Sequence, residues 1–295
     1  FNNYSKFFSL QILLEKQTVM YVCPVCGESL QLQQSGKSYA CSKQHSFDLA
    51  KEGYLNLLPV QYKHSKEPGD SKHMMMARRE FLEAGFYESM SKAVAMMIVA
   101  NLPKGQDRRL LDLGCGEGYY SRKIAHYCNH SEQIAFHGID IAKFAVAAAA
   151  KKQPNARFAV ASSRRLPYPD QYFDFVLRVF APSDDEELKR VLKPSGYLLT
   201  ITPGPHHLWQ LKEFIYAGVK EHASENPVPQ GFELSAAQRI SYKITPNSRQ
   251  RMALLQMTPF AWQANESVQQ AISSVTNLEI ETDFILTLSV KTAVV

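Results

Sequence analysis

Four side chains of metal-binding type lie in two closely spaced pairs near the start of the chain. Two residues separate Cys23 from Cys26, fourteen residues follow, and three residues separate Cys41 from His45. Two such ligands can hold one ion from a single turn, so this spacing predicts a tetrahedral Cys3His zinc site. Four protein ligands leave no open position, which indicates a structural ion. Disulfides or buried thiols are the alternatives, and a reducing compartment disfavours disulfides.

A second chemical group lies in the segment LLDLGCGEGYY, residues 110–120. Glycines between a strand and a helix allow a ligand to approach the backbone, and the helix N-terminus offers unpaired N–H groups. The spacing Gly-x-Gly-x-Gly differs from the Gly-x-Gly-x-x-Gly of dinucleotide-binding folds, which disfavours NAD. The three glycines are Gly114, Gly116 and Gly118.

An acid at the end of the next predicted strand completes the pattern. Asp140 ends the segment QIAFHGID, and one carboxylate can accept hydrogen bonds from both hydroxyls of a ribose. A tight turn with helix-capping acids is the alternative. Strand, glycine loop, helix and second acid together favour a ligand and resemble the S-adenosylmethionine site of class I methyltransferases. In that resemblance Asp112 orders the loop or reaches the methionine ammonium through water, and Glu117 lies beside the methionine end.

The elements that must position these residues alternate along the chain. Short apolar runs at 109–114, 133–140, 156–162, 173–180 and 196–203 predict strands, and the alanine-rich segment 141–152 predicts a helix. Alternating strands and helices predict an α/β fold with a mainly parallel, doubly wound sheet. The stretch 193–196, KPSG, suits a helix-ending turn, and residues 278–291 could close the sheet edge.

Composition and turn residues suggest how the chain is divided. Its 295 residues are 45% hydrophobic and 21% charged, as expected for a globular protein with a small extra module. A Ser-Gly-Lys turn at 35–37 suits a hairpin between the two metal-ligand pairs. We expect an upstream segment before a native start at Met20, a zinc ribbon, a basic linker and a methyltransferase domain, at residues 1–19, 20–60, 61–80 and 81–295.

The composition also limits location and partners. No apolar stretch approaches the roughly 20 residues of a membrane span, and no secretory signal is recognisable, so we expect a cytoplasmic protein with no membrane partner. A net charge of +5 permits a nucleic-acid partner without requiring one. Basic residues of the linker could meet phosphates or form a solvated face: Lys63, Lys66, Lys72, Arg78 and Arg79. We expect Met74–Met76, Cys115 and Cys128 to be packing residues.

Several segments in order resemble the bacterial 23S rRNA guanine-N(1)-methyltransferases of the RlmA type. They follow the zinc-ligand pattern as AKEGYLNLLP, EPGD, ARREFLEAGFY, LDLGCGEGYY, TPGPHHL and LLQMTPFAW, and extend over nearly everything after Met20. The resemblance implies methyl transfer from S-adenosylmethionine to a single guanine in a hairpin of 23S rRNA. Small zinc modules attached to enzymes commonly hold a nucleic-acid substrate, so we expect the ribbon beside the basic linker to recognise RNA; a homodimer is left open.

Further site residues follow from this resemblance. It places Ser162, Ser163 and Leu166 near the adenine, and Tyr87 and His207 over the methionine end, although each could be a packing residue. Residues after the fourth predicted strand line the substrate pocket in related folds: Arg178, Phe180 and Pro182. Phe180 either stacks on the base or ends a buried strand, and Trp262 is expected in the core. The general base is not identifiable from sequence.

Two other functions are compatible with parts of the sequence. A methyltransferase of a small metabolite would explain the glycine loop but would leave the ribbon without a role. A nucleic-acid-binding zinc protein that senses S-adenosylmethionine would explain both features without turnover. Binding to RNA that weakens steeply with salt distinguishes the metabolite enzyme from the other two functions, and turnover distinguishes the enzyme from the sensor.

Overall fold

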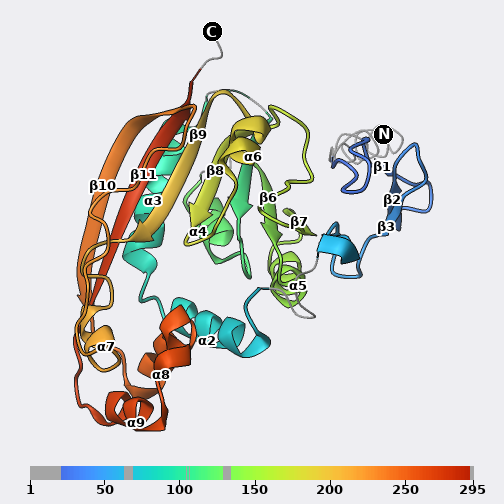
Figure 1. Ribbon diagram of the computed structural model, residues 1–295. Helices are drawn as coiled ribbons and strands as arrows, with labels where there is room; N and C mark the ends of the chain where they lie inside the picture. Colours follow the sequence, from blue (N-terminus) through green and yellow to red (C-terminus); the bar gives the residue numbers. More distant parts are fainter. Residues whose placement is uncertain (1–20, 63–68, 104, 106, 129–133, 293–295) are drawn as a thin grey trace, which may run out of the picture.

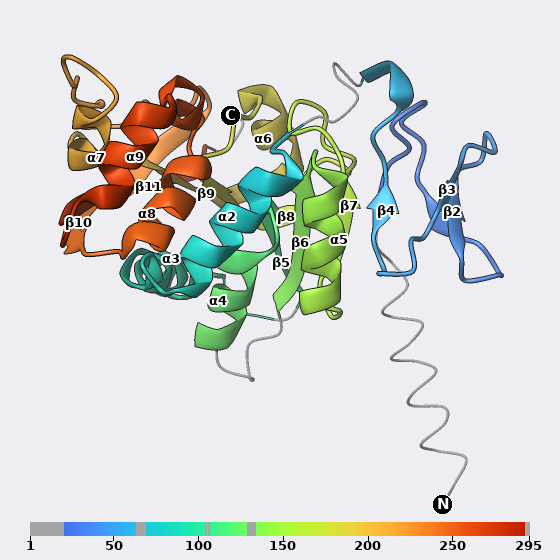
Figure 2. The ribbon, with the colours of Figure 1, turned by 90° about the horizontal axis from the view of Figure 1, so that it is seen from below.

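The main body of the protein is an eight-stranded sheet. The computed structural model describes residues 21–62, 69–103, 105, 107–128 and 134–292. The strand order is β10-β11-β9-β8-β5-β6-β7-β4 (Figures 1 and 2). Strands β4 to β9 run parallel, whereas β10 and β11 are antiparallel to their neighbours. The bounds are β4 Leu55–Asn56, β5 Arg108–Leu113, β6 Ile134–Asp140, β7 Arg157–Val160, β8 Phe173–Val179, β9 Leu192–Pro203, β10 Phe232–Ile244 and β11 Ile280–Lys291.

Helices cover both faces of this sheet, which confirms the doubly wound fold. One apolar core joins residues of α3, α4 and α5 to one face, and a second joins α6 and the ribbon to the other. Neighbouring strand residues divide between the cores: Leu110 packs in the first and Leu111 in the second. The helices are α2 Lys72–Glu83, α3 Glu88–Asn101, α4 Tyr119–Tyr127, α5 Lys143–Lys152, α6 Asp185–Val191, α7 Trp209–Glu213, α8 Ser248–Gln256 and α9 Glu266–Ser274, with 3-10 turns η1 Val60–Tyr62 and η2 Pro259–Gln263.

The structure corrects two expectations about the end of the sheet. Residues 278–291 do not close the edge, because β11 lies between β9 and β10. The edge is β10, whose side chains are mostly exposed; apolar and polar residues alternate along most of its sequence, FELSAAQRISYKI, a strand signal that the sequence predictions missed. The segment KPSG belongs to β9 rather than to a separate turn, and Ser195 takes a left-handed φ of 58° beside a register shift.

The zinc-ribbon segment forms a small antiparallel sheet of its own. Strands β1 Gln31–Leu32, β2 Ser38–Ala40 and β3 Ser46–Asp48 lie in that order. The predicted hairpin is confirmed, since Leu32 pairs with Tyr39 across a turn in which Gly36 has a φ of +67°. A left-handed residue in so tight a turn favours glycine.

The ribbon continues directly into the main sheet (Figure 2). Strand β4 pairs in parallel with β7, and the Leu57 backbone N–H donates to the Val160 carbonyl at 2.9 Å. The rings of Tyr21 and Tyr168 lie 5.3 Å apart between the two parts. The described part of the ribbon segment, residues 21–60, therefore shares a core with the larger domain, and the boundary expected at residue 81 falls inside α2. The expected start at Met20 and the segment before it lie outside the described residues.

Candidate active site and metal centre

The four predicted metal ligands converge on one point of the ribbon. The ligand atoms of Cys23, Cys26, Cys41 and His45 all lie within 4.8 Å of one another. The Cys26 and Cys41 sulfurs are 3.7 Å apart, and the Cys41 sulfur is 3.4 Å from His45 Nδ1. A disulfide needs about 2.05 Å between sulfurs, whereas zinc–sulfur bonds of about 2.3 Å place tetrahedral ligands roughly 3.8 Å apart. The donor set and its spacing therefore fit a structural zinc ion, as predicted.

The glycine loop requires glycine at its first position for two reasons. Gly114 has a φ of +74°, and a Cβ added there would lie 2.6 Å from the Cβ of Ala181. The amides of Gly114 and Cys115 both donate to the Ile139 carbonyl at 2.9 Å, which holds the loop against β6. Gly118, with a φ of +70°, is the N-cap residue of α4. The loop thus brings bare backbone to the carboxyl ends of β5 and β6, where open α/β sheets bind ligands.

The two acids of the pattern have different positions. Asp112 is buried beneath the loop, and its carboxylate accepts a 2.5 Å hydrogen bond from the Ser121 hydroxyl. Burial raises the pKa of Asp112 to about 6. Asp140 lines the cavity above the loop and accepts hydrogen bonds from the amides of Gly116 at 3.0 Å and Ala142 at 2.8 Å. Asp112 therefore orders the loop and helix, whereas Asp140 faces the space open to a ligand.

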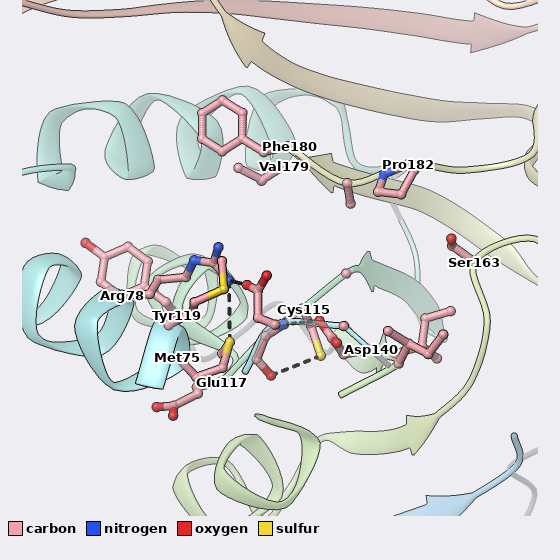
Figure 3. Close-up of a pocket in the computed structure, with 18 of the residues that line it drawn as sticks. Met75, Arg78, Cys115, Glu117, Tyr119, Asp140, Ser163, Val179, Phe180 and Pro182 are labelled. Carbon is pink, nitrogen blue, oxygen red and sulfur yellow. Dashed lines mark hydrogen bonds and ion pairs between the residues drawn. The ribbon is translucent and has the colours of Figure 1, made fainter. Parts of the chain in front are cut away.

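A cavity of about 900 Å³ opens over this loop. Figure 3 shows Phe180 and Pro182 on one side of it, facing Glu117 and Asp140. The volume is at the upper end of the usual range for a ligand pocket, large enough for a nucleoside cofactor with a second group beside it. Most of the predicted cofactor residues line it: Tyr87, Gly114, Gly116, Glu117, Asp140, Ser162, Ser163 and His207.

Three predicted cofactor residues do not line the cavity. Asp112 is buried beneath the loop, and Gly118 is the N-cap residue of α4. Leu166 is 1% exposed in the second apolar core, and its amide donates to the Glu187 carboxylate at 2.6 Å. Leu166 is therefore placed as a packing residue.

Of the substrate candidates at the end of β8, two line the cavity and one does not. Phe180 is 43% exposed, has a left-handed φ of 52° and lines the cavity together with Pro182. Of the two alternatives for Phe180, its exposure to the cavity favours contact with a ligand, although the residue directly follows the buried strand β8. Arg178 lies outside the cavity lining, where its guanidinium donates to the hydroxyls of Ser183 and, at 3.1 Å, Thr200.

Acids in the cavity wall bind the linker arginines. Arg79 makes a two-pronged ion pair with Glu117, at 2.6 Å and 2.5 Å, and Lys152 lies 3.1 Å from the same carboxylate. Burial alone would raise the pKa of Glu117, but these hydrogen bonds outweigh it and lower the pKa. Arg78 pairs with Asp70 and donates to the Met257 carbonyl at 3.2 Å. Both arginines are thus held by the protein rather than presented to phosphate.

The remaining linker predictions have mixed outcomes. Lys63 and Lys66 lie outside the described residues, and Lys72 lies 5.7 Å from the centre of the Phe144 ring. Met75 is buried as expected, whereas Met76 is 51% exposed. Cys115 and Cys128 are buried away from the metal ligands.

Tyr87 and His207 meet at the inner wall of the cavity. The Tyr87 hydroxyl lies 3.4 Å from His207 Nε2, and both side chains are buried. Phe284 contacts both rings, with centroids 4.9 Å from each. Burial lowers the pKa of His207 to about 3, so its imidazole is neutral.

Sequence reasoning missed a group of residues that reach the cavity from the ribbon side. Arg165 donates to the Tyr62 hydroxyl at 2.6 Å, which joins the end of the ribbon segment to the loop after β7. No local pattern in the sequence could predict these residues, because the pairing of β4 with β7 brings them to the cavity. The lining from this side comprises Pro24, Leu57, Leu58, Pro59, Tyr62, Arg164 and Arg165.

The structure also corrects Trp262. This residue was expected in the core, but it is 83% exposed in the turn η2. Its neighbours Pro259 and Phe260 line the cavity. The apolar segment that suggested burial therefore divides between the cavity wall and the surface.

None of the described helices has both the length and the apolar character needed to cross a membrane.

Comparisons with known proteins match both parts of the chain. Residues 21–66 match the family model described as RlmA, N-terminal, and residues 110–196 match that of a methyltransferase domain. A Bacillus subtilis (strain 168) relative with the provisional name 23S rRNA (guanine-N(1)-)-methyltransferase YxjB is 30% identical over 94% of this chain and 100% of its own. The 23S rRNA (guanine(748)-N(1))-methyltransferase of Streptomyces fradiae is 29% identical over 84% of this chain and 88% of its own.

Another kind of methyltransferase matches a smaller part. The malonyl-[acyl-carrier protein] O-methyltransferase of Halorhodospira halophila (strain DSM 244 / SL1) is 32% identical over 36% of this chain and 38% of its own. The relative whose match covers nearly the whole chain, zinc ribbon included, is thus one named for rRNA modification. The match to the enzyme with a different acceptor extends over about a third of the chain.

Proposed function

The chain belongs to the family of 23S rRNA (guanine-N(1)-)-methyltransferases, and from this premise we propose that it methylates N1 of a guanine in 23S rRNA with S-adenosylmethionine as donor. One observation of the structure carries the proposal: the glycine loop and the zinc ribbon open on the same cavity. A metabolite enzyme would have no use for a ribbon at its active site. A zinc module that borders the pocket suits a substrate much larger than the base that enters it.

We propose that the carboxyl ends of β5, β6 and β7 hold the cofactor. The Asp140 carboxylate is placed to accept the ribose hydroxyls, while Ser162 and Ser163 border the adenine. Gly114 and Gly116 let the cofactor approach the backbone. When bound, S-adenosylmethionine supplies a methyl group on a positively charged sulfur. This charge is dispersed in the transition state, so a cavity wall of mixed polar and apolar groups favours transfer.

We propose that the guanine enters between this cofactor site and the residues after β8. Phe180 is exposed to the cavity and can stack on a base that has left its helix, and Pro182 fixes the turn behind it. Bases in an RNA loop are already partly unstacked, so extruding one costs less than from a duplex. A hairpin loop is therefore the expected context of the guanine.

The remaining parts of the proposal concern organisation. Residues 20–60 would recognise RNA, 61–80 would connect, and 81–295 would carry the transfer reaction. A protein that modifies rRNA would act in the cytoplasm, which is therefore part of the proposal. A homodimer stays a prediction, which the molecular mass of the zinc-loaded protein in solution will test.

The experiment that tests the function is transfer of a labelled methyl group to 23S rRNA from a strain that lacks the modification. Primer extension locates the product, because a methyl group on N1 blocks base pairing. We expect a single stop at one guanine of a hairpin, and no stop in a matched RNA with adenine at that position. Tight cofactor binding without incorporation into naked RNA or ribosomal subunits would instead favour a small-molecule acceptor.

A further inference from the structure

Two neighbouring arginines lie on the ribbon side of the cavity, in the loop that follows β7. Arg164 and Arg165 both line the cavity, and both residues are exposed. The backbone of this loop is fixed by hydrogen bonds, because the Arg164 amide donates to the Ser162 hydroxyl at 3.2 Å and the Arg165 amide donates to the Ser162 carbonyl at 3.3 Å. The loop therefore presents two positive charges at the rim of the cavity.

The other cations of the cavity wall are matched by acids. Among the described residues that line the cavity, the remaining basic side chains each form an ion pair with a carboxylate that lines it too. These pairs are Arg78 with Asp70, Arg79 with Glu117, Arg122 with Glu83, and Lys152 with both Glu83 and Glu117. Near Arg164 and Arg165, the carboxylates of Asp170 and Glu187 are bound by Arg190 at 3.0 Å and 2.7 Å. In the described part of the chain, the positive charge of the cavity that no acid matches thus belongs to Arg164 and Arg165.

Arg165 is oriented by the end of the ribbon segment. Its guanidinium donates to the Tyr62 hydroxyl at 2.6 Å and lies 5.4 Å from the centre of the same ring. A guanidinium has five N–H donors in a fixed fork, so this bond leaves several of them for a ligand. The Arg164 side chain makes no hydrogen bond or ion pair with any described residue. One arginine is therefore held in place beside the cavity, and its neighbour can turn toward the same ligand.

The chemistry of this pair suits a phosphate. A guanidinium fork matches two oxygens of a phosphate, with charge as well as geometry in its favour. The proposed cofactor has no phosphate, and its carboxylate lies at the methionine end, whereas the arginines follow Ser163, which we place beside the adenine. RNA carries a phosphate at every nucleotide. A strand that delivers a base into the cavity must cross its rim, and the ribbon borders the rim at this point.

We propose that Arg164 and Arg165 bind the phosphate of a nucleotide directly beside the target guanine, and that Tyr62 holds Arg165 for this contact. The inference rests on the proposed function. In the view of Figure 3, Ser163 lies on the far side of Pro182 from Phe180. A strand whose base stacks on Phe180 would lead past Pro182 toward the arginines. Phosphate contacts position a strand and carry no sequence information, so the pair would fix the RNA while the base is extruded, and would not select guanine.

The first test measures how binding of RNA depends on salt. The probe is the 23S rRNA hairpin mapped by primer extension, and the protein is the zinc-loaded full chain. Loss of one phosphate contact to a single strand lowers the slope of log affinity against log salt by about 0.7. Arg164→Gln should show this lower slope and bind roughly tenfold more weakly at low salt.

Arg249→Gln is the matched control, because it removes the same charge from a side chain that is 83% exposed, pairs with Glu80 at 2.6 Å and does not line the cavity. It should keep the wild-type slope and an affinity within about twofold of wild type. All variants should keep one zinc ion per chain and, by calorimetry, an affinity for S-adenosylhomocysteine within about twofold of wild type.

The second test identifies the phosphate. Methylphosphonate linkages, which carry no charge, replace the phosphates around the target guanine one at a time. For the wild-type protein, the linkage beside the guanine that meets the arginines should weaken binding roughly tenfold. In Arg164→Gln and in Arg165→Gln the same replacement should cost about twofold or less, because the contact is already lost. Arg249→Gln should show the full wild-type loss.

Two results would overturn the inference while leaving the function intact. In the first, Arg164→Gln and Arg165→Gln keep the wild-type loss at every methylphosphonate. In the second, they lose affinity for S-adenosylhomocysteine while the salt dependence of RNA binding is unchanged, which would assign the arginines to the cofactor. A wild-type protein that methylates no guanine of 23S rRNA would overturn the proposed function, and with it the inference that rests on that function.

Discussion

The zinc ribbon and the glycine loop both build a ligand site from tight turns. The ribbon does so with side chains, whereas the loop does so with its backbone. In the ribbon, side chains hold the ion, and a Cβ at Gly36 would meet nothing within 4 Å. In the loop, the backbone forms the site, and a Cβ at Gly114 would collide with Ala181. The ribbon should therefore depend on its ligands and tolerate changes in its turns, whereas the loop should depend on its backbone.

Loss of a zinc ligand is the strongest test of this difference. Cys41→Ser should abolish stoichiometric zinc binding, because metal binding supplies the folding energy of so small a module, about 10 kcal/mol or more. We expect the hydrogen-exchange protection of residues 21–49 to collapse. Affinity for S-adenosylhomocysteine should also fall, because ribbon residues border the cavity.

Cys128→Ser is the control for this variant, since Cys128 is buried away from the four ligands. It should keep one zinc ion per chain and the protection of the ribbon. A Cys41→Ser protein that retains both would mean that contacts with the main sheet, rather than zinc, hold the ribbon together.

Gly36 and Gly114 both have a left-handed φ, so replacing each with alanine should separate the effect of backbone strain from that of a steric clash. Gly36 and Gly114 have similar φ values, +67° and +74°, so both variants incur a backbone cost of about 1–2 kcal/mol. Gly114→Ala must also displace Ala181, which adds roughly 1–3 kcal/mol. We expect Gly114→Ala to lose at least tenfold in affinity for S-adenosylhomocysteine and Gly36→Ala to lose none, as measured by calorimetry and urea unfolding. Equal losses in the two variants would remove the distinction.

The free energy of unfolding should depend on pH through the titration of Asp112 beneath the glycine loop. Its pKa in the folded protein is about 6, raised by burial above the ordinary 3.8, so between these values the folded state binds more protons than the unfolded state. Stability from this group is therefore greatest below pH 4 and falls as pH rises toward 6, by up to about 3 kcal/mol. Asp112→Asn should lack this component, so the stability of the variant relative to wild type should rise with pH across the window.

Urea unfolding at several pH values measures this component. Asp170→Asn serves as the control, because that side chain is 74% exposed. If the Asp112→Asn protein and the wild type show parallel pH profiles, Asp112 does not carry the burial cost that its position implies.

The sequence predicted correctly those features that depend on residues close together in the chain. The spacing of Cys23 and Cys26, the glycines before α4 and the apolar runs of β5 to β9 all depend on neighbours in the sequence. The edge strand β10 was missed although apolar and polar residues alternate along most of FELSAAQRISYKI, so a local signal for it was present in the sequence. The two residues of β4 are too few to form a pattern, yet their pairing with β7 brings the ribbon to the cavity.

Burial of single aromatic residues was the least predictable property. Phe180 and Trp262 both lie in apolar segments, and both are exposed. Hydrophobic neighbours indicate that a segment packs against the protein, but they do not determine which member of the segment points outward. That choice is set by where strand β8 and the turn η2 meet the cavity, which depends on contacts between distant elements.

The exposed Trp262 gives the smallest but most selective prediction. Trp262→Ala should change the free energy of unfolding by no more than about 0.5 kcal/mol, because the side chain is 83% exposed. If Trp262 stacks on a nucleotide at the rim of the cavity, the same variant should weaken RNA binding by about 1–3 kcal/mol.

The chain has only two tryptophans, so in Trp209→Phe protein the fluorescence of Trp262 reports directly on this contact. Quenching by hairpin RNA together with weaker binding by Trp262→Ala would extend the substrate surface from the ribbon side of the cavity to η2. Unchanged fluorescence and affinity would confine RNA contacts to the ribbon side, and the division between a ligand-held ribbon and a backbone-built loop would then also separate RNA recognition from cofactor binding.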